Sequence, residues 1–173
     1  MVDTKYCRDP DRVRLMPGAA EGLRILVENG FSIVVVTNQS GIGRGYFDRQ
    51  ALEAVNSRLS QELQARGATL HALYYCPHLP DDVCSCRKPM PGLLLRAAAD
   101  LDLDLATCYM VGDRGLDVEA GRAAGARTIL ISKDHGGSGS FVEPDFVAKD
   151  LVEAARLILS DQPLREEVPP CES

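Results

Sequence analysis

A cluster of sulfur and nitrogen side chains lies near the middle of the sequence. Cys76-Pro77-His78 is followed after five residues by Cys84-Ser85-Cys86, so three thiols and one imidazole occur within eleven positions. Thiolate and imidazole are ligands that Zn²⁺ prefers, and four of them leave no open coordination position. The alternative is a loop of unliganded cysteines beside a surface histidine. We favour a structural zinc site formed by Cys76, His78, Cys84 and Cys86, because buried cysteines normally lie in helices and strands rather than in a proline-containing loop.

Polar residues that could hold a phosphate follow two other segments. Thr37 and Asn38 end the most β-branched run of the sequence and offer a hydroxyl and an amide, although such residues commonly serve only as turns or caps. Arg87 and Lys88 place two cations directly after the cysteine loop. Cations in such positions neutralise phosphate oxygens, whereas a basic pair without other context is simply solvated.

Two carboxylates follow a third apolar run. Asp113 comes directly after Gly112, and Asp117 lies four residues later. A carboxylate at the end of a strand is well placed to bind Mg²⁺ beside a phosphate. We favour Asp113 for this role, because an acid at the position of Asp117 stabilises a helix N-terminus whatever the chemistry.

The elements that must position these residues alternate between strands and helices. Period-two and period-3.6 patterns predict strands over 31–37, 70–76, 107–111 and 127–132, with a further short strand near Phe146. They predict helices between Pro17-Gly18 and Asn29-Gly30, and over 49–66, 91–103, 115–124 and 150–160. Short connections favour an α/β domain with a parallel sheet, in which ligands bind at the carboxyl ends of the strands. We expect one domain over 1–160 and a disordered tail over 161–173.

Composition excludes several classes of function. The 173 residues include 19 Lys and Arg against 25 Asp and Glu, giving a net charge of −6 and no basic run for nucleic acid. No apolar run approaches the roughly 20 residues of a membrane span, and Met1 to Lys5 show no signal-peptide pattern. We therefore expect a cytoplasmic monomer with free or metal-bound thiols, which acts on a small molecule rather than on a nucleic acid or a membrane.

Taken in order, these groups resemble the second, third and fourth motifs of the haloacid dehalogenase-like phosphatases. Thr37 to Phe47, Cys76 to His78 and Cys84 to Gly92 further resemble the D-glycero-D-manno-heptose 1,7-bisphosphate 7-phosphatases within that family. Histidinol-phosphate phosphatases share the zinc loop, but usually lack the pattern Arg44-Gly45-Tyr46-Phe47. The resemblance implies a Rossmann-like three-layer sandwich and a Mg²⁺-dependent phosphatase acting through an aspartyl-phosphate, with histidinol phosphate as the alternative substrate.

The resemblance also implies a role for each matching residue. Thr37 and Lys88 would stabilise the transferring phosphoryl group, and Asp113 would bind Mg²⁺. The substrate would be lined by Asp3, Tyr6, Asn38, Gln39, Ser40, Arg87 and Arg114. Family members usually carry Lys at the position of Arg114, which keeps the charge but changes its shape.

The first motif of the family does not occur in this sequence. That motif is an apolar strand ending in Asp-x-Asp-Gly, whose first aspartate attacks phosphorus and whose second acts as general acid and base. Asp9 and Asp11 follow no apolar run and flank Pro10, so we interpret them as turn residues. Because that strand lies centrally in the family's sheet, its loss predicts a gap with unpaired backbone groups on both sides.

Three explanations fit this difference from the family. We expect that the start codon was assigned too far downstream, since the remaining motifs are intact. The alternatives are a catalytically inactive, zinc-stabilised binding module, and a chain completed by a strand from a partner.

Overall fold

The computed structural model of the chain describes residues 7–132 and 142–162. Strands and helices alternate through them, in chain order: the 3-10 helix η1 (Pro10–Arg12), α1 (Ala19–Glu28), β1 (Val34–Asn38), α2 (Ser40–Gly43), α3 (Arg49–Gln64), β2 (Ala72–Cys76), α4 (Gly92–Leu101), the 3-10 helix η2 (Leu105–Thr107), β3 (Tyr109–Gly112), α5 (Gly115–Ala123), β4 (Arg127–Ile131), β5 (Phe146–Ala148) and α6 (Leu151–Asp161). Among the residues described, no helix has the length and apolar character needed to span a membrane.

Side-chain caps start several of these helices. Asp48 accepts a hydrogen bond from the amide of Ala51 at 2.8 Å at the start of α3, and Asp150 accepts one from Glu153 at 2.9 Å at the start of α6. Such caps satisfy amides that have no partner inside the helix. Asp48 and Asp150 therefore fix where α3 and α6 begin.

The strands form two parallel sheets instead of one. β1 pairs with β2 from Val34 opposite Ala72 to Asn38 opposite Cys76, and the second sheet has the order β3-β4-β5. Among the described residues β1 pairs only with β2, and β3 pairs only with β4, so each of the two has one unpaired edge. This arrangement confirms the predicted α/β fold with parallel strands, and it has the interruption between two neighbouring strands that the missing motif predicts.

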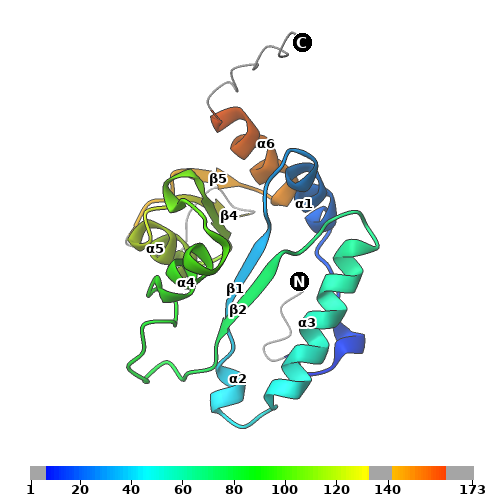
Figure 1. Cartoon of the computed structure of the whole chain (residues 1–173), viewed down its shortest axis with the longest axis vertical. Coiled ribbons are helices and arrows are strands. Elements are labelled where there is room, and N and C mark those ends of the chain that lie inside the picture. The colour runs from blue at the N-terminus through cyan, green and yellow to red at the C-terminus, as the bar shows by residue number, and fades with distance from the viewer. Residues whose placement is uncertain (1–6, 133–141, 163–173) are drawn as a thin grey trace, which may run out of the picture.

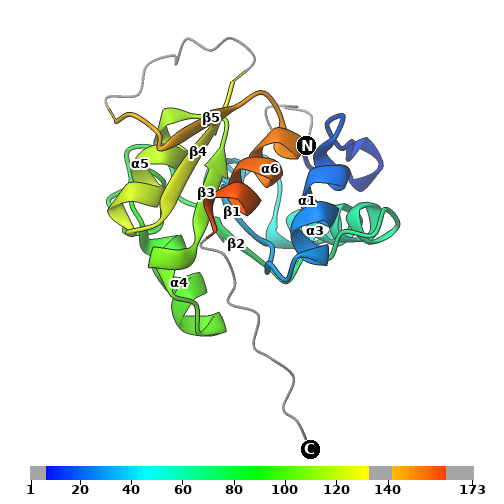
Figure 2. The ribbon, with the colours of Figure 1, turned by 90° about the horizontal axis from the view of Figure 1, so that it is seen from above.

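Helices cover both faces of the two sheets. Seen from above, α4 and α5 lie on one side of the strands, and α1, α3 and α6 lie on the other (Figure 2). The buried core crosses between the sheets, because Leu26 and Ile33 on the β1 side join Ile129, Ala155 and Ile158 on the β4 side in a single apolar cluster. The two sheets and their helices therefore pack around one core, although within the described part of the chain no hydrogen bonds join the sheets into a continuous one (Figure 1).

The structure differs from the sequence-based expectation at a few boundaries. β1 begins at Val34 instead of Phe31, because the Phe31 amide bonds to the carbonyl of Leu26 and closes the turn after α1. Residues 40–43, expected as part of a polar loop, form the short helix α2. Asp161 belongs to α6, and its carboxylate accepts a hydrogen bond from the Tyr109 hydroxyl at 2.5 Å. The remainder of the expected tail lies outside the described residues.

Asp145, directly before β5, connects β4 with α5. Its carboxylate accepts hydrogen bonds from the amide and hydroxyl of the buried Thr128 on β4, at 2.8 and 2.7 Å, and pairs with Arg122 of α5 at 3.3 Å. The hydrogen bond from the Thr128 hydroxyl is the main cause that lowers the pKa of Asp145.

We predict that this carboxylate makes the stability of the protein pH-dependent. A lowered folded-state pKa gives stability that is present above the unfolded pKa of about 4 and is lost as the pH falls through the folded value. Asp145→Asn should lower the free energy of unfolding by about 1 kcal/mol at pH 7 and reduce the loss on acidification. Urea unfolding at pH 7 and pH 3 tests this, with the exposed Glu53→Gln as control. An unchanged acid slope in Asp145→Asn would contradict the prediction.

Candidate active site and zinc centre

The backbone of Lys88 is held by the side chain of Asn38 at the end of β1. The Lys88 amide donates to Asn38 Oδ1 at 3.0 Å, and Asn38 Nδ2 donates to the Lys88 carbonyl at 3.1 Å. This two-way pair uses both polar ends of the asparagine amide. Asn38 therefore positions Lys88, while its expected contact with substrate stays a prediction.

The side chain of Lys88 connects β1 with α5, the helix that follows β3. Its Nζ donates to the carbonyl of Val36 on β1 at 2.9 Å and forms an ion pair with Asp117 Oδ1 at 2.6 Å. Asp117 is only 6% exposed, and its other oxygen accepts a hydrogen bond from the Arg114 amide at the start of α5. The ammonium group thus occupies a position between the edge of β1 and the residues that follow β3.

Asp117 has a larger role than the helix-dipole effect expected from its position. A Cβ atom added to Gly112 would lie 2.3 Å from the Asp117 side chain, so this carboxylate packs against the end of β3 at a place that only glycine allows. The sequence pattern contained the signal, because the acid follows a strand-end glycine at a fixed spacing. Lys88 and Asp117 lie far apart in the sequence, so the pattern does not predict that they form an ion pair.

The other predicted site residues lie around the same strand ends. The Thr37 hydroxyl accepts a hydrogen bond from Gln39 Nε2 at 3.3 Å, and Ser40 begins α2. Arg87 Nη1 donates to the carbonyl of His78 at 3.1 Å, which ties this arginine to the cysteine loop. Asp113 is exposed directly after β3, and Arg114 is the N-cap of α5. Asp3 and Tyr6 lie outside the described residues.

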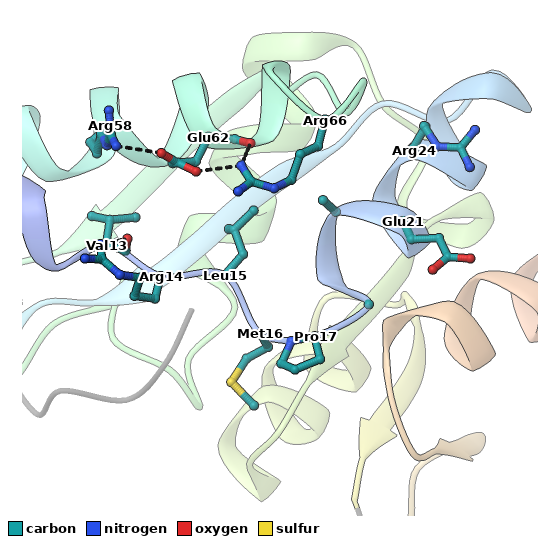
Figure 3. Close-up of a pocket in the computed structure, with 12 residues that line it drawn as sticks. Val13, Arg14, Leu15, Met16, Pro17, Glu21, Arg24, Arg58, Glu62 and Arg66 are labelled. Atoms are coloured by element: carbon teal, nitrogen blue, oxygen red, sulfur yellow. Dashed lines mark hydrogen bonds and ion pairs between the residues drawn. The ribbon is translucent and has the colours of Figure 1, made fainter.

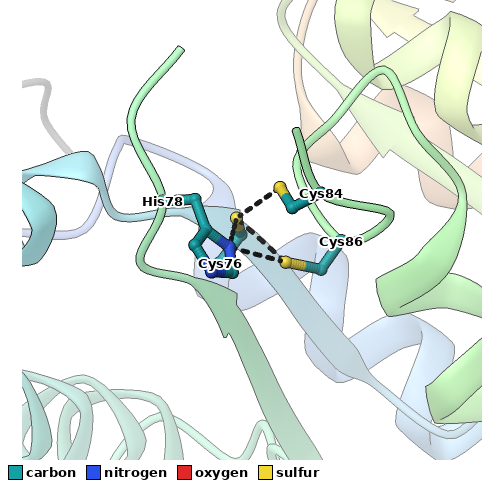
Figure 4. Close-up of side chains that lie close together, drawn as sticks. All are labelled: Cys76, His78, Cys84 and Cys86. Carbon is teal, nitrogen blue, oxygen red and sulfur yellow. Dashed lines mark hydrogen bonds between the residues drawn. The ribbon is translucent and has the colours of Figure 1, made fainter. Parts of the chain in front are cut away.

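The predicted zinc ligands converge in space. Cys76, His78, Cys84 and Cys86 each offer one ligand atom, and these atoms all lie within 4.8 Å of one another (Figure 4). The Cys76 sulfur is 3.8 Å from that of Cys84, about the separation that zinc–sulfur bonds of roughly 2.3 Å give in a tetrahedron, and 3.1 Å from that of Cys86, which is shorter than this separation. Burial, followed by hydrogen bonding to Cys86, raises the pKa of Cys76 to about 12. A bound Zn²⁺ would oppose this, because it deprotonates coordinating thiols.

The cysteine loop also contacts the elements that carry the site. Cys76 ends β2 beside Asn38 of β1, and the Gly92 amide at the start of α4 donates to the Ser85 carbonyl at 3.0 Å. A Cβ at Gly92 would lie 2.2 Å from that carbonyl oxygen, so the loop and the helix approach closely. Because Lys88 comes two residues after Cys86, a metal in the loop would fix the chain that leads to Lys88.

Comparisons with known proteins agree with this geometry. The HAD-hydrolase-like family profile matches residues 85–154. The D-glycero-β-D-manno-heptose-1,7-bisphosphate 7-phosphatase of Yersinia pestis is 40% identical over 137 residues, which cover 75% of this chain and 73% of the relative. The enzyme of that name from Escherichia coli K12 is 36% identical over 174 residues, covering 93% and 89%. The chain belongs to the haloacid dehalogenase-like hydrolases and, within them, to the heptose bisphosphate phosphatase family.

Solved structures of this family share the fold. The D,D-heptose 1,7-bisphosphate phosphatase of Bordetella bronchiseptica, complexed with magnesium and phosphate, superimposes with a TM-score of 0.79 at 31% identity and covers 92% of each chain. A HAD-like phosphatase from Mesorhizobium loti gives a TM-score of 0.76 at 34% identity, covering 92% of this chain and 79% of the other. The resemblance drawn from the motifs is therefore confirmed.

Asp113 fits the role of a magnesium ligand only as one member of a larger set. Mg²⁺ takes six oxygen atoms, and protein sites commonly supply one or two carboxylates while phosphate and water provide the rest. Asp117 faces Lys88, so Asp113 is the exposed acid that remains after β3. Among the described ranges, clusters of three or more metal-binding side chains occur only at the cysteine loop. Most of a magnesium shell here would come from phosphate and water.

For the cysteine loop we predict one equivalent of zinc per chain. Because a structural zinc site contributes directly to folding, Cys84→Ser and removal of the metal by a chelator should both lower the melting temperature. Metal analysis by mass spectrometry and thermal denaturation provide the measurements. Cys108→Ser is the control, since this partly buried cysteine lies outside the cluster. Full stability in metal-free protein would refute the zinc site.

For the ion pair we predict that the two partners depend on each other. Lys88→Met leaves a buried carboxylate without its cation and should cost about 3 kcal/mol of stability. Lys88→Met combined with Asp117→Asn should recover part of that loss, because the uncompensated charge is removed. A double-mutant cycle measured by urea unfolding gives the coupling, and the exposed pair Arg96–Asp100 on α4 is the matched control. If the losses in the free energy of unfolding of the Lys88 and Asp117 single variants simply add in the double variant, the pairing is contradicted.

Proposed function

We propose that the carboxyl ends of β1 and β3 bind the phosphate of a sugar phosphate, and that the protein hydrolyses the 7-phosphate of D-glycero-D-manno-heptose 1,7-bisphosphate. The observation that carries this proposal is the placement of Lys88. Its ammonium group has three N–H donors, of which Val36 and Asp117 use two. The third remains for a phosphoryl oxygen at the end of the sheet.

The other residues of the site have complementary roles in this proposal. Phosphoryl transfer spreads negative charge over the equatorial oxygens of phosphorus, and a fixed cation stabilises that charge. Lys88 would supply the cation, and the Thr37 hydroxyl would donate to a second oxygen. Asp113 would hold Mg²⁺, which when bound neutralises further charge on the phosphate. Asp117 would keep Lys88 in place without touching the substrate, and Asn38 would hold the Lys88 backbone while it lines the substrate site.

The attacking group is the part of the mechanism that these residues do not supply. In the family, by resemblance, an aspartate at the end of a strand attacks phosphorus, and this sequence has no Asp-x-Asp-Gly. Within residues 7–132 and 142–162, β1 and β3 each have an unpaired edge, and Lys88 lies between Val36 of β1 and Asp117 after β3. A carboxylate carried on a strand between these edges would lie beside the ammonium group. The alternative, a non-catalytic zinc-stabilised module, would keep phosphate binding and lack turnover.

The loop after α2 favours a heptose bisphosphate over histidinol phosphate. Phe47 is buried and anchors this loop, whereas Tyr46 is 52% exposed and its carbonyl accepts a 3.5 Å hydrogen bond from Arg8. Arg44 is exposed in the same turn. An exposed arginine and tyrosine beside the site suit a polyhydroxylated substrate with a second phosphate.

Phosphate release assays on two forms of the protein test the proposal. One form is the 173-residue chain, and the other includes the residues encoded in frame upstream of Met1. We expect the longer form to hydrolyse heptose bisphosphate in a Mg²⁺-dependent reaction, with kcat/KM at least about tenfold above that for histidinol phosphate. Thr37→Val should lower kcat about a hundredfold, as loss of one oxyanion donor typically does. Arg96→Gln, on the exposed surface of α4, is the control.

The remaining outcomes separate the alternatives. A folded longer form that turns over neither substrate would overturn the proposal. Preference for histidinol phosphate would favour the other branch of the family. Mg²⁺-dependent release by the 173-residue chain itself would exclude the non-catalytic module and would place the attacking group within this sequence.

A further inference from the structure

A second, strongly basic cavity lies between the later half of α3, the start of α1 and the segment 13–17 that leads into it (Figure 3). Its volume is about 830 Å³, within the range of small-molecule sites. Four arginines line it, and two glutamates, Glu21 and Glu62, oppose them. The lining therefore carries two excess positive charges (4 − 2), in a chain whose net charge is −6. It shares no residue with the strand-end site.

Glu62 is surrounded by more positive charge than it can neutralise. Its two carboxylate oxygens pair with Arg58 of α3 at 2.7 Å and with Arg66, just beyond the end of α3, at 2.5 Å. The hydrogen bond from Arg66, together with the charges of Arg58, Arg66 and Arg14, lowers the pKa of Glu62. Three guanidinium groups thus act on a single carboxylate, so a positive field remains at the cavity.

The arginines keep hydrogen-bond donors that the surrounding protein does not use. Each guanidinium has five N–H groups. Arg58 Nε is buried and has no hydrogen-bond partner in the described part of the chain. Arg14 is held by the carbonyls of Asp11 and Val13 at 2.7 and 2.8 Å, and Arg24 pairs with Glu28, which lies outside the cavity lining. The guanidinium groups are therefore oriented before any ligand arrives.

We propose that this cavity binds a small molecule that carries two adjacent phosphate groups, at a site separate from the proposed phosphatase centre. Two excess charges match a polyanion better than a monoanion, and planar guanidinium groups recognise phosphate through paired hydrogen bonds. Arg58, Arg66 and Arg14 contact the anion, and Glu62 sets the affinity by competing with it. The site does not depend on the proposed function.

Pyrophosphate is the probe for this site. Titration into the full chain, followed by isothermal calorimetry and by the NMR signals of the arginine Nε–H groups, reports both affinity and location. We expect the Arg58 and Arg66 signals to shift and saturate, and Arg58→Gln with Arg66→Gln to weaken binding about a hundredfold. Arg96→Gln removes an arginine from an exposed ion pair on α4 and should leave binding unchanged. Inorganic phosphate should bind more weakly than pyrophosphate.

Glu62→Gln distinguishes a binding site from a merely structural cluster. The variant removes the competing carboxylate and releases Arg58 and Arg66 from their ion pairs, although Arg66 Nη1 keeps its hydrogen bond to the Glu62 carbonyl, so pyrophosphate should bind about tenfold more tightly. Loss of structure would weaken binding instead, and far-ultraviolet circular dichroism verifies the fold. Pyrophosphate that saturates without shifting the Arg58 and Arg66 signals, or a Glu62→Gln variant that binds more weakly while folded, would overturn the proposal.

Discussion

The ion pair between Lys88 and Asp117 is the interaction on which the arrangement of the site depends. β1 and β3 share no backbone hydrogen bonds, so the ends of the two sheets are not aligned by a strand ladder. Lys88 spans this interruption by binding the Val36 carbonyl on one side and Asp117 on the other. A buried ion pair adds little to stability on its own, but removing one partner is costly. The ion pair therefore fixes the position of the Lys88 ammonium group at the ends of the strands.

Two other features of the fold maintain this pair. Asn38 holds the backbone of Lys88 from β1, and the cysteine loop fixes the preceding residues between the end of β2 and the start of α4. Metal binding at Cys76, His78, Cys84 and Cys86 would consequently affect the position of Lys88 without any contact between metal and substrate. The apolar core around Ile129 and Ile158 packs the two sheets together, and the polar residues of the site lie at the ends of the strands.

Much of this arrangement is predictable from local sequence signals. The apolar spacing over 49–66 predicts α3, and the β-branched run before Thr37 predicts β1, because periodicity and β propensity are local properties. The cluster of Cys76, His78, Cys84 and Cys86 is predictable because these residues lie within eleven positions of one another. The pairing of Lys88 with Asp117 and the two-way bond of Asn38 join residues far apart in the chain, so no local pattern indicates them. No local pattern indicates the basic cavity either, because Arg14 and Arg24 come together with Arg58 and Arg66 only after folding.

The central claim is that a phosphate group binds beside Lys88 at the ends of β1 and β3. An amide NMR titration of the full chain with inorganic phosphate and Mg²⁺ tests it directly. The account predicts saturable shifts at Asn38 and Gln39 after β1, and at Asp113 and Arg114 after β3, with the amide of Lys88 among them. If other amide signals shift and saturate while the signals of these five residues stay unchanged, the claim is contradicted.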